Sequence, residues 1–370
     1  MAMRIISVVG TRPNFVKIAP LIKEFQKHEE IESILVHTGQ HYDEEMSKLL
    51  FDDLQIPKPD MNLDVGSSTD IQQTAAIMTE LEKVFLEKRP DLVVVVGDVN
   101  STFAAAITAK KCNIEVAHIE AGLRSFDMQM PEEINRILTD HVSDYLFTTE
   151  ASGSINLKKE NISQKKVFFV GNVMIDSLLS HREKSEHSRI LENKNLKKNS
   201  YCAATFHRPS NVDSRIALIE LLDLAERVSH KIKIVLPLHP RTSSNMEKFG
   251  LSQKAANIRN LVLMKPLSYL DFMHLMANSK FVITDSGGIQ EETTVLQVPC
   301  ITYRENTERP STVKEGTNLI VSTDKKRILK IVDKIIANKI PAKSKIPKLW
   351  DGKAAKRIVE VILKNYERKK

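Results

Sequence analysis

Short runs of apolar and β-branched residues recur along the whole chain, separated by amphipathic stretches of roughly ten to twenty residues, a spacing typical of helical crossovers between parallel strands. In the first half, the expected strands lie at 4–10, 33–39, 91–98, 116–122, 145–150 and 167–172. In the second half, they lie at 201–207, 233–239, 261–266, 281–287, 300–306 and 318–323. The pattern therefore predicts an α/β fold with two doubly wound, Rossmann-like sheets.

The length and one polar segment predict how these elements divide into domains. A chain of 370 residues exceeds the size of one ordinary hydrophobic core. The lysine-rich segment 180–200 separates the two groups of strands, and a hinge is expected near Gly171. We expect an N-terminal domain at 1–171, a C-terminal domain at 172–351, and a final helix within 352–370 that packs back on the first domain. Two such domains would face each other across a cleft, with ligands beyond the carboxyl ends of the strands.

Composition narrows the class of protein. Apolar residues make up 42% of the chain and charged residues 27%, as in globular proteins. No apolar run approaches the roughly 20 residues of a membrane-spanning helix, and the first residues lead directly into an expected strand. The three cysteines, Cys112, Cys202 and Cys300, show no metal-ligand spacing and cannot all pair. These features predict a cytoplasmic protein without a membrane association or a disulfide framework.

The formal net charge of +7 fits either an anionic small ligand or a nucleic acid. Many of the lysines lie in polar runs such as "KKENISQKK" and "DKKRILK", which contain no aromatic residue. Nucleic-acid surfaces of the stacking type interleave aromatic and basic side chains. The pattern therefore favours a solvated surface, and no nucleic-acid partner is expected.

Charged residues follow several of the expected strands in the first half. Arg12 and Lys17 come after the first strand in "GTRPNFVKIAP", where a helix N-terminus already favours anions, although plain turn chemistry explains that segment equally well. Asp98 ends another strand, where a role as an N-cap or turn residue explains it equally well, and Glu120 follows the neighbouring strand. Carboxylates at neighbouring strand ends would couple as like charges and shift their pKa values, as proton-transfer groups require.

The segment "MPEEINR" opens the next expected helix with Glu132, Glu133 and Arg136. Acidic residues stabilise the first turn of a helix, so each glutamate taken singly is explained by the helix dipole. Their position close to Asp98 and Glu120 favours a second interpretation, in which this helix start adds a further carboxylate to the same crevice.

The second half adds candidates for binding a phosphate. His207 lies at the end of the strand 201–207, beside Arg208. Arg309 follows a later strand in "RENTERP" and is a candidate phosphate or uracil contact. A lone histidine is usually structural, but a histidine beside an arginine at a strand end favours contact with an anion.

The segment "TDSGGIQEETTVLQVPC" carries the most specific local signal. Ser286, Gly287 and Gly288 open a helix after a strand, so backbone N–H groups can approach a diphosphate without obstruction by a Cβ atom. Glu291 and Glu292 follow on the first turn, where one of the two carboxylates could accept hydrogen bonds from ribose hydroxyls. The alternative is a glycine-rich turn without a ligand.

Seven motifs together resemble the non-hydrolysing UDP-N-acetylglucosamine 2-epimerases. They are "GTRPNFVKIAP", "GDVNST", "HIEAGLRS", "MPEEINR", "HRPSNVD", "DSGGIQEE" and "RENTERP", and they span nearly the whole chain in this order. The resemblance implies the GT-B architecture, a homodimer, and activity without a metal or a cofactor. It implies the catalytic residues Asp98, Glu120, Glu132 and His207. It further implies the substrate-binding residues Arg12, Lys17, Arg136, Ser286, Gly287, Gly288, Glu292 and Arg309.

The implied reaction interconverts UDP-N-acetylglucosamine and UDP-N-acetylmannosamine. The C2 proton of the sugar is not acidic, and in this family UDP is eliminated across C1 and C2 to leave a 2-acetamidoglucal. UDP then adds back while C2 is protonated on the opposite face. Such a route requires a base, an acid and electrostatic support for the departing diphosphate.

Two departures from the family pattern affect this interpretation. Asn14 stands where many members have an acidic residue, although an asparagine form also occurs. In several bacterial members a second UDP-N-acetylglucosamine binds through a glutamine-histidine-arginine motif. This chain keeps Gln40 and His41 but has Tyr42 in place of the arginine, so the resemblance does not carry that activator site over.

Four alternatives stay open on the sequence. The same chemistry could act on a modified UDP-sugar, such as a 2,3-diacetamido uronic acid nucleotide. A hydrolysing relative would release free N-acetylmannosamine and UDP, but its first motif usually departs from "GTRP". A GT-B glycosyltransferase would need fewer carboxylates, and a non-catalytic UDP-sugar sensor would not need Asp98, Glu120, Glu132 and His207 together.

Overall fold

The computed structural model of the chain describes residues 2–39, 51, 53–66, 68–340 and 344–368. The chain forms two units. Unit 1 consists of Met1–Ser180 together with Lys348–Lys370, and unit 2 is His181–Pro347. The division falls within helix α7 (Val173–Ser185), and the sequence pattern predicts a hinge near Gly171.

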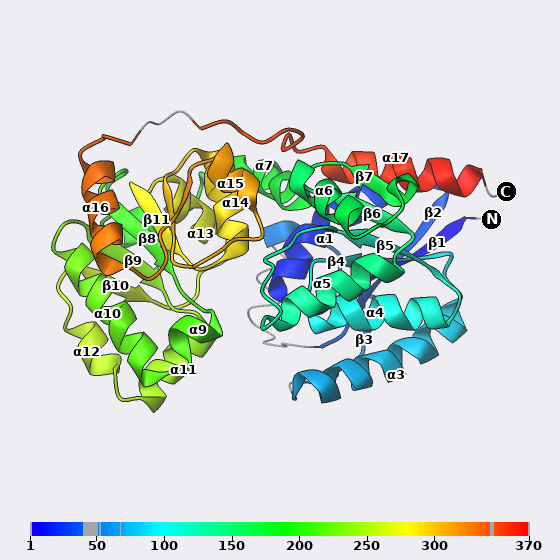
Figure 1. Ribbon diagram of the computed structural model, residues 1–370, viewed down its shortest axis with the longest axis horizontal. Helices are drawn as coiled ribbons and strands as arrows, with labels where there is room; N and C mark the ends of the chain where they lie inside the picture. The colour runs from blue at the N-terminus through cyan, green and yellow to red at the C-terminus, as the bar shows by residue number, and fades with distance from the viewer. Residues whose placement is uncertain (1, 40–50, 52, 67, 341–343, 369–370) are drawn as a thin grey trace. The chain divides into compact units, whose positions relative to one another are not determined.

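Unit 1 is built on a seven-stranded sheet in the order β3-β2-β1-β4-β5-β6-β7, and each pair of neighbouring strands is parallel (Figure 1). In chain order the strands are β1 (Met3–Val9), β2 (Ile31–His37), β3 (Met61–Asn62), β4 (Leu92–Val96), β5 (Glu115–Ile119), β6 (Tyr145–Thr148) and β7 (Val167–Phe169). Strand β4 is buried along its whole length, because a central parallel strand is covered on both faces and therefore reads as a continuous apolar run.

The helices of unit 1 alternate with these strands. They are α1 (Arg12–Phe25), α3 (Asp70–Lys88), α4 (Asn100–Lys111), α5 (Pro131–Val142), α6 (Ala151–Lys159), the 3-10 turn η1 (Gln164–Lys166), α7 and α17 (Ala354–Glu367). Helix α4 packs between α3 and α5 (Figure 1). Alternate residues of β4, such as Val93 and Val95, pack in the apolar core that α3 and α4 line. Helix α17 packs against α1.

Unit 2 is built on a six-stranded parallel sheet in the order β10-β9-β8-β11-β12-β13. Its strands are β8 (Tyr201–Thr205), β9 (Lys233–Pro237), β10 (Leu261–Met264), β11 (Phe281–Thr284), β12 (Cys300–Thr302) and β13 (Asn318–Ile320). Its helices are α8 (Ile190–Asn193), α9 (Pro209–Val212), α10 (Arg215–Ser229), α11 (Pro240–Lys248), α12 (Ser252–Ala256), α13 (Tyr269–Ala277), α14 (Gly287–Leu296), α15 (Pro310–Lys314) and α16 (Lys325–Ile336).

The alternation of side chains along β8 shows that helices cover both faces of this second sheet. Cys202 and Ala204 belong to one apolar core, which also contains Leu221 of α10. Tyr201 and Ala203 belong to another, which contains Leu275 of α13. Because successive side chains of a strand point to opposite faces, the two cores lie on opposite sides of the sheet.

The prediction of two doubly wound α/β sheets is confirmed, since each predicted run overlaps an observed strand. Strand β3 was not predicted, because two residues carry no periodicity. In the described part of the chain, no helix is long and apolar enough to cross a membrane.

One buried carboxylate attaches the C-terminal helix to unit 1. Asp176 of α7 accepts hydrogen bonds from the first two N–H groups of α17, those of Ala354 at 3.1 Å and Ala355 at 2.7 Å. Burial raises the pKa of Asp176 to about 6 and Asp351 adds to this, while the two N–H groups and Arg357 act in the opposite direction. In the folded chain this carboxyl group therefore retains its proton to a higher pH than in the unfolded chain.

We expect Asp176→Ala to lower the unfolding free energy of unit 1 by about 1 to 2 kcal/mol, the usual cost of losing a helix N-cap. A carboxyl group whose pKa is raised by folding stabilises the folded state at low pH, and this contribution is lost as the pH rises. The difference in unfolding free energy between the wild type and the variant should therefore be greater at pH 5 than at pH 8. Trp350, the single tryptophan, is buried next to α17 and reports on unit 1 by fluorescence during urea unfolding.

Glu360→Ala, at an exposed position of α17 in the same unit, is the control, and it should change stability by less than about 0.5 kcal/mol. If the unfolding free energy of the wild type exceeded that of Asp176→Ala by more at pH 8 than at pH 5, the direction of the pKa shift would be wrong.

Candidate active site

The charged groups of unit 1 lie at the carboxyl ends of β4 and β5. The two strands pair in parallel with Val96 beside Ile119, so Asp98 and Glu120 emerge from the same edge of the sheet. Glu120 has a φ of +73°, a backbone conformation that residues other than glycine rarely adopt. Such backbone strain concentrates at functional sites, where the surrounding contacts hold it in place.

Each of these two carboxylates contacts a cation. Glu120 forms a buried ion pair with Lys17 of α1. Asp98 is partly buried, and its Oδ2 lies 2.5 Å from a guanidinium nitrogen of Arg136 on α5. The sequence emphasised coupling between like charges, whereas the structure pairs each carboxylate with a positive charge from a different helix.

The two glutamates at the start of α5 differ in their environment. Glu133 is fully buried, and it accepts hydrogen bonds from Ser125 and from the N–H of Phe126 and contacts Arg136. Glu132 is exposed to solvent, and no ion pair or hydrogen bond of its carboxylate is found within the described residues. Glu133 therefore holds the loop before α5, and Glu132 is the glutamate that a ligand can reach.

The turn after β1 brings α1 to the same edge of the sheet. Arg12 is the first residue of α1 and is partly buried, and Lys17 lies further along the helix. The Oδ1 of Asn14 accepts from the N–H groups of Gly10 and Thr11, while its Nδ2 donates to the carbonyl oxygen of Val96 at 2.9 Å. An ionised acidic residue at position 14 could not make that last bond.

In unit 2, a buried aspartate holds the turn that carries His207. Asp285, directly after β11, accepts from the N–H groups of His207 and Arg208, and lies 3.1 Å from the ring Nδ1 of His207. Burial would raise the pKa of Asp285, but His207 and the other donors outweigh it and lower the pKa. Asp285 was not predicted as a site residue, although it stands at a strand end beside Ser286.

The N-terminus of α14 follows on the same strand, and it presents Ser286, Gly287 and Gly288 in succession. A Cβ atom on Gly287 would lie 2.5 Å from the guanidinium of Arg309, so a larger residue there would displace that guanidinium from the helix start. The helix start and Arg309 thus offer N–H donors and a positive charge in one place, as an anion requires.

Further carboxylates surround Arg309. Its Nη1 lies 2.5 Å from Glu308, and its Nε lies 2.9 Å from the fully buried Glu291. Glu292 is also buried, and it accepts a hydrogen bond of 3.1 Å from the Tyr269 hydroxyl. The roles of Glu291 and Glu308 as partners of Arg309 were missed, because nothing in the local sequence indicates which charges meet in space.

Three further features bear on a second site: clusters of metal-ligating side chains, surface cavities and the segment that carries Gln40 to Tyr42. Among the described residues, no group of three or more His, Cys, Asp and Glu side chains could hold a metal ion. A surface cavity of about 380 Å³ lies at the amino ends of the strands and is lined by Arg4 and Glu32, which pair with each other at 2.9 Å. It is remote from the strand ends that carry the charged groups above. Gln40, His41 and Tyr42 lie outside the described residues.

Comparison with known proteins gives full-length matches. Residues 23–363 match the family model described as UDP-N-acetylglucosamine 2-epimerase. The chain is 44% identical over 363 residues to a UDP-N-acetylglucosamine 2-epimerase homolog of Methanococcus maripaludis, covering 97% of this chain and 99% of the relative. It is 38% identical over 365 residues to the UDP-2,3-diacetamido-2,3-dideoxy-D-glucuronate 2-epimerase of Pseudomonas aeruginosa, covering 98% and 100%.

Among solved structures, the fold is similar to the crystal structure of the Methanocaldococcus jannaschii UDP-GlcNAc 2-epimerase in complex with UDP-GlcNAc and UDP. The TM-score is 0.92 at 39% sequence identity, and the match covers 98% of this chain and 99% of the other.

Two doubly wound parallel sheets, together with this likeness, make the protein an α/β enzyme of the GT-B type. The chain belongs to the UDP-N-acetylglucosamine 2-epimerase family, and it is accordingly an isomerase.

Proposed function

We propose that the protein interconverts UDP-N-acetylglucosamine and UDP-N-acetylmannosamine by eliminating UDP to a 2-acetamidoglucal and adding it back. The observation that carries the proposal is the pair of carboxylates Asp98 and Glu120 at neighbouring strand ends, each in contact with a cation. An elimination needs groups that accept and donate protons next to groups that carry charge, and this edge of unit 1 offers both. Family membership adds the substrate class, since several relatives are named for it.

In the proposed reaction, Asp98, Glu120 and Glu132 are the acid and base groups. One carboxylate removes the C2 proton, and another group returns a proton to the opposite face of C2, which inverts that carbon. Lys17 and Arg136 contact Glu120 and Asp98, and together with Arg12 they bind the substrate. The exposed carboxylate of Glu132 is accessible to a sugar.

Unit 2 supplies the groups that we assign to UDP. The start of α14, with Ser286, Gly287 and Gly288, directs backbone N–H groups at the diphosphate. Arg309 adds positive charge there, and His207 assists the departure of UDP. Glu292 accepts from the ribose hydroxyls. Stabilising the charge that develops on the diphosphate lowers the barrier to breaking the C1–O bond.

A second candidate substrate is a UDP-2,3-diacetamido uronic acid. The full-length match at 38% identity to the Pseudomonas aeruginosa epimerase favours it, because that relative is named for this modified sugar. The diphosphate-binding groups in unit 2 would serve both substrates equally.

Proton NMR of the purified protein with UDP-N-acetylglucosamine in deuterated water tests the proposal. We expect loss of the C2 proton signal by exchange with solvent deuterium and the appearance of a second anomeric signal, because the route breaks and remakes the C2–H bond.

Absence of exchange at high enzyme concentration, with exchange on the diacetamido uronic acid nucleotide, would replace the first substrate with the second. Stoichiometric release of free UDP would instead indicate a hydrolysing enzyme. Absence of exchange on both nucleotides would overturn the proposed reaction.

The proposed division of roles predicts opposite kinetic effects in the two units. Glu120→Gln keeps the volume of the side chain but cannot accept a proton, so kcat should fall by about two to four orders of magnitude. The dissociation constant for UDP should change by less than about twofold, because UDP is assigned to unit 2. Glu115→Gln, at the amino end of the same strand, is the control and should leave kcat unchanged.

Arg309→Lys is the reciprocal variant. It keeps a positive charge beside Glu291 and Glu308 but lacks the planar fork of a guanidinium. UDP should bind about tenfold more weakly, while kcat at saturating substrate stays within about threefold. Calorimetry with UDP and steady-state rates measure both effects. Loss of UDP binding in Glu120→Gln, or unchanged turnover there, would contradict the assignment.

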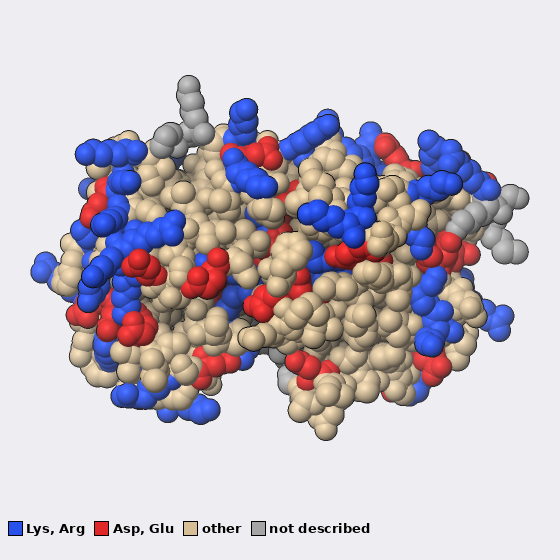
Figure 2. Space-filling model, in the orientation of Figure 1, with Lys and Arg blue, Asp and Glu red and all other residues tan. Residues whose placement is uncertain are grey.

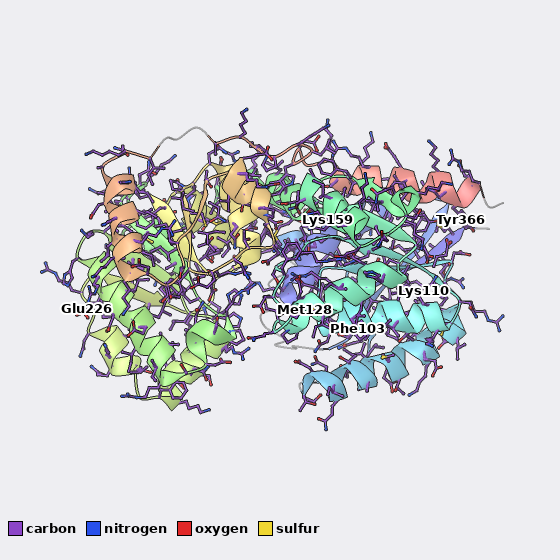
Figure 3. All side chains as sticks on the ribbon, viewed as in Figure 1. Phe103, Lys110, Met128, Lys159, Glu226 and Tyr366 are labelled. Carbon is purple, nitrogen blue, oxygen red and sulfur yellow. The ribbon has the colours of Figure 1, made fainter. Side chains whose placement is uncertain are left out.

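We further propose that the protein is a homodimer that associates through α5 and the loop before it. Ile134 and Leu138 lie four residues apart on α5 and are both exposed, as are Phe126 and Met128 in the loop. Figure 2 shows few charged side chains over α4 and α5, and in Figure 3 Met128 and Phe103 lie in this region. A second copy of the chain would remove these apolar side chains from water.

Sedimentation velocity should give the mass of two chains for the wild type and of one chain for the double variant Ile134→Glu, Leu138→Glu. Two buried like charges would be introduced on each side of the interface, and their desolvation opposes association. Ile216→Glu, which alters an apolar residue of unit 2 that is more exposed than Ile134 and Leu138, should remain dimeric. A monomeric wild type, or a dimeric double variant, would refute this interface.

A further inference from the structure

The turn that follows β4 is held by side chains at three successive carbonyl groups, those of residues 96, 97 and 98. The carbonyl of Val96 accepts hydrogen bonds of 2.9 Å from Asn14 of α1 and from Thr102 of α4. The carbonyl of Gly97 lies 2.8 Å from His118 of β5, and the carbonyl of Asp98 accepts a hydrogen bond of 3.0 Å from Asn135 of α5. Turns usually leave such carbonyls to water, so this degree of fixation requires a reason.

The fixed turn lies against the proposed proton-transfer groups. Gly97 has a φ of +74°, and a Cβ atom there would lie 3.2 Å from the Nζ of Lys17 and 3.4 Å from the Oε2 of Glu120. The next residue is Asp98. A rotation of the Gly97 peptide would therefore move Asp98 and disturb the Lys17–Glu120 pair at the same time.

His118 is the donor that controls this peptide directly. Its ring is fully buried, with Nε2 at 2.8 Å from the carbonyl oxygen of Gly97 and Nδ1 at 2.7 Å from Oδ1 of Asp140. Both neighbours of the ring accept hydrogen bonds. The Gly97 carbonyl oxygen carries no hydrogen, and Asp140 accepts a hydrogen bond from the N–H of Gly122 and forms an ion pair with Arg124. Burial would raise the pKa of Asp140, but His118 and Arg124 outweigh it and lower the pKa. Asp140 therefore remains a carboxylate, and each ring nitrogen of His118 faces an oxygen that accepts hydrogen bonds.

We infer that His118 is a positioning residue for the proton-transfer site: it holds the Gly97 carbonyl so that Asp98 and Glu120 keep their spacing, without touching the substrate itself. The inference rests on the proposed roles of Asp98 and Glu120. Asp140 and Arg124 orient the ring, and the ring transmits that orientation to the Gly97 peptide.

Two substitutions of similar volume separate the two bonds of the ring. The amide nitrogen of asparagine reaches the position of Nδ1, so His118→Asn keeps the bond to Asp140 and loses the bond to Gly97. The amide nitrogen of glutamine reaches the position of Nε2, so His118→Gln keeps the bond to Gly97. We expect kcat to fall about 10- to 100-fold in His118→Asn, because a small misplacement of reacting groups costs rate on this scale. In His118→Gln it should stay within about threefold, and KM and UDP affinity should change by less than about twofold in both.

Amide hydrogen exchange provides a readout that does not depend on activity. The N–H of Gly97 donates to the carbonyl oxygen of Ile119 at 3.0 Å, and it should exchange faster in His118→Asn than in His118→Gln. His28→Asn, on the partly exposed histidine before β2, controls for loss of an imidazole and should behave as the wild type in both measurements.

The outcomes distinguish this inference from the proposed function. Equal losses of kcat in the two His118 variants, or unchanged kcat in His118→Asn, would overturn the positioning role. If the wild type fails to epimerise either nucleotide, the proposed function is wrong, and the exchange of the Gly97 N–H still decides whether His118 fixes the turn. Equal exchange in the two variants would overturn it.

Discussion

The parallel register of β4 with its two neighbours is the constraint on which the charged edge of unit 1 depends. Val96 lies beside Ile119 on one side, and Val95 lies beside Val8 of β1 on the other. The residues that follow these three strands therefore emerge together, and α1 delivers Lys17 to the same edge. A slip of one residue in any of these pairings would turn the side chains that follow the strand to the opposite face, so the register of the strands also fixes the site.

Charges that leave water at this edge are stable only because each has a partner. Arg136 is buried and contacts Asp98 at 2.5 Å and Glu133 at 2.5 Å, so one guanidinium joins the strand end to the loop before α5. Arg309 does the same in unit 2 between Glu291 and Glu308. Removing one member of such a group leaves a buried charge uncompensated, which costs far more than the intact pair contributes. These arginines therefore fix the local geometry as well as supplying charge.

The strands and the strand-end residues could be predicted from the sequence because their signals are local. Continuous β-branched runs identify buried strands, and the rule that ligands bind at the carboxyl ends of strands directs attention to Asp98, Glu120 and His207. The pairing of charges could not be predicted, since Lys17 and Glu120 are 103 residues apart and only the folded chain brings them together. Nor does a helix start indicate which of Glu132 and Glu133 is buried, because both satisfy the same first-turn preference.

Asn14 shows how one amide can connect two of these turns. Its Oδ1 accepts from the turn after β1, and its Nδ2 donates to the last carbonyl of β4, so the two turns are bonded through a neutral group. Asn14 and Lys17 both lie within 4 Å of the point that a Cβ on Gly97 would occupy. A carboxylate at position 14 would bring a second negative charge close to the Lys17–Glu120 pair and could not donate to Val96 unless it were protonated. The asparagine therefore adds no further negative charge beside the Lys17–Glu120 pair and keeps the turn before Asp98 attached to α1.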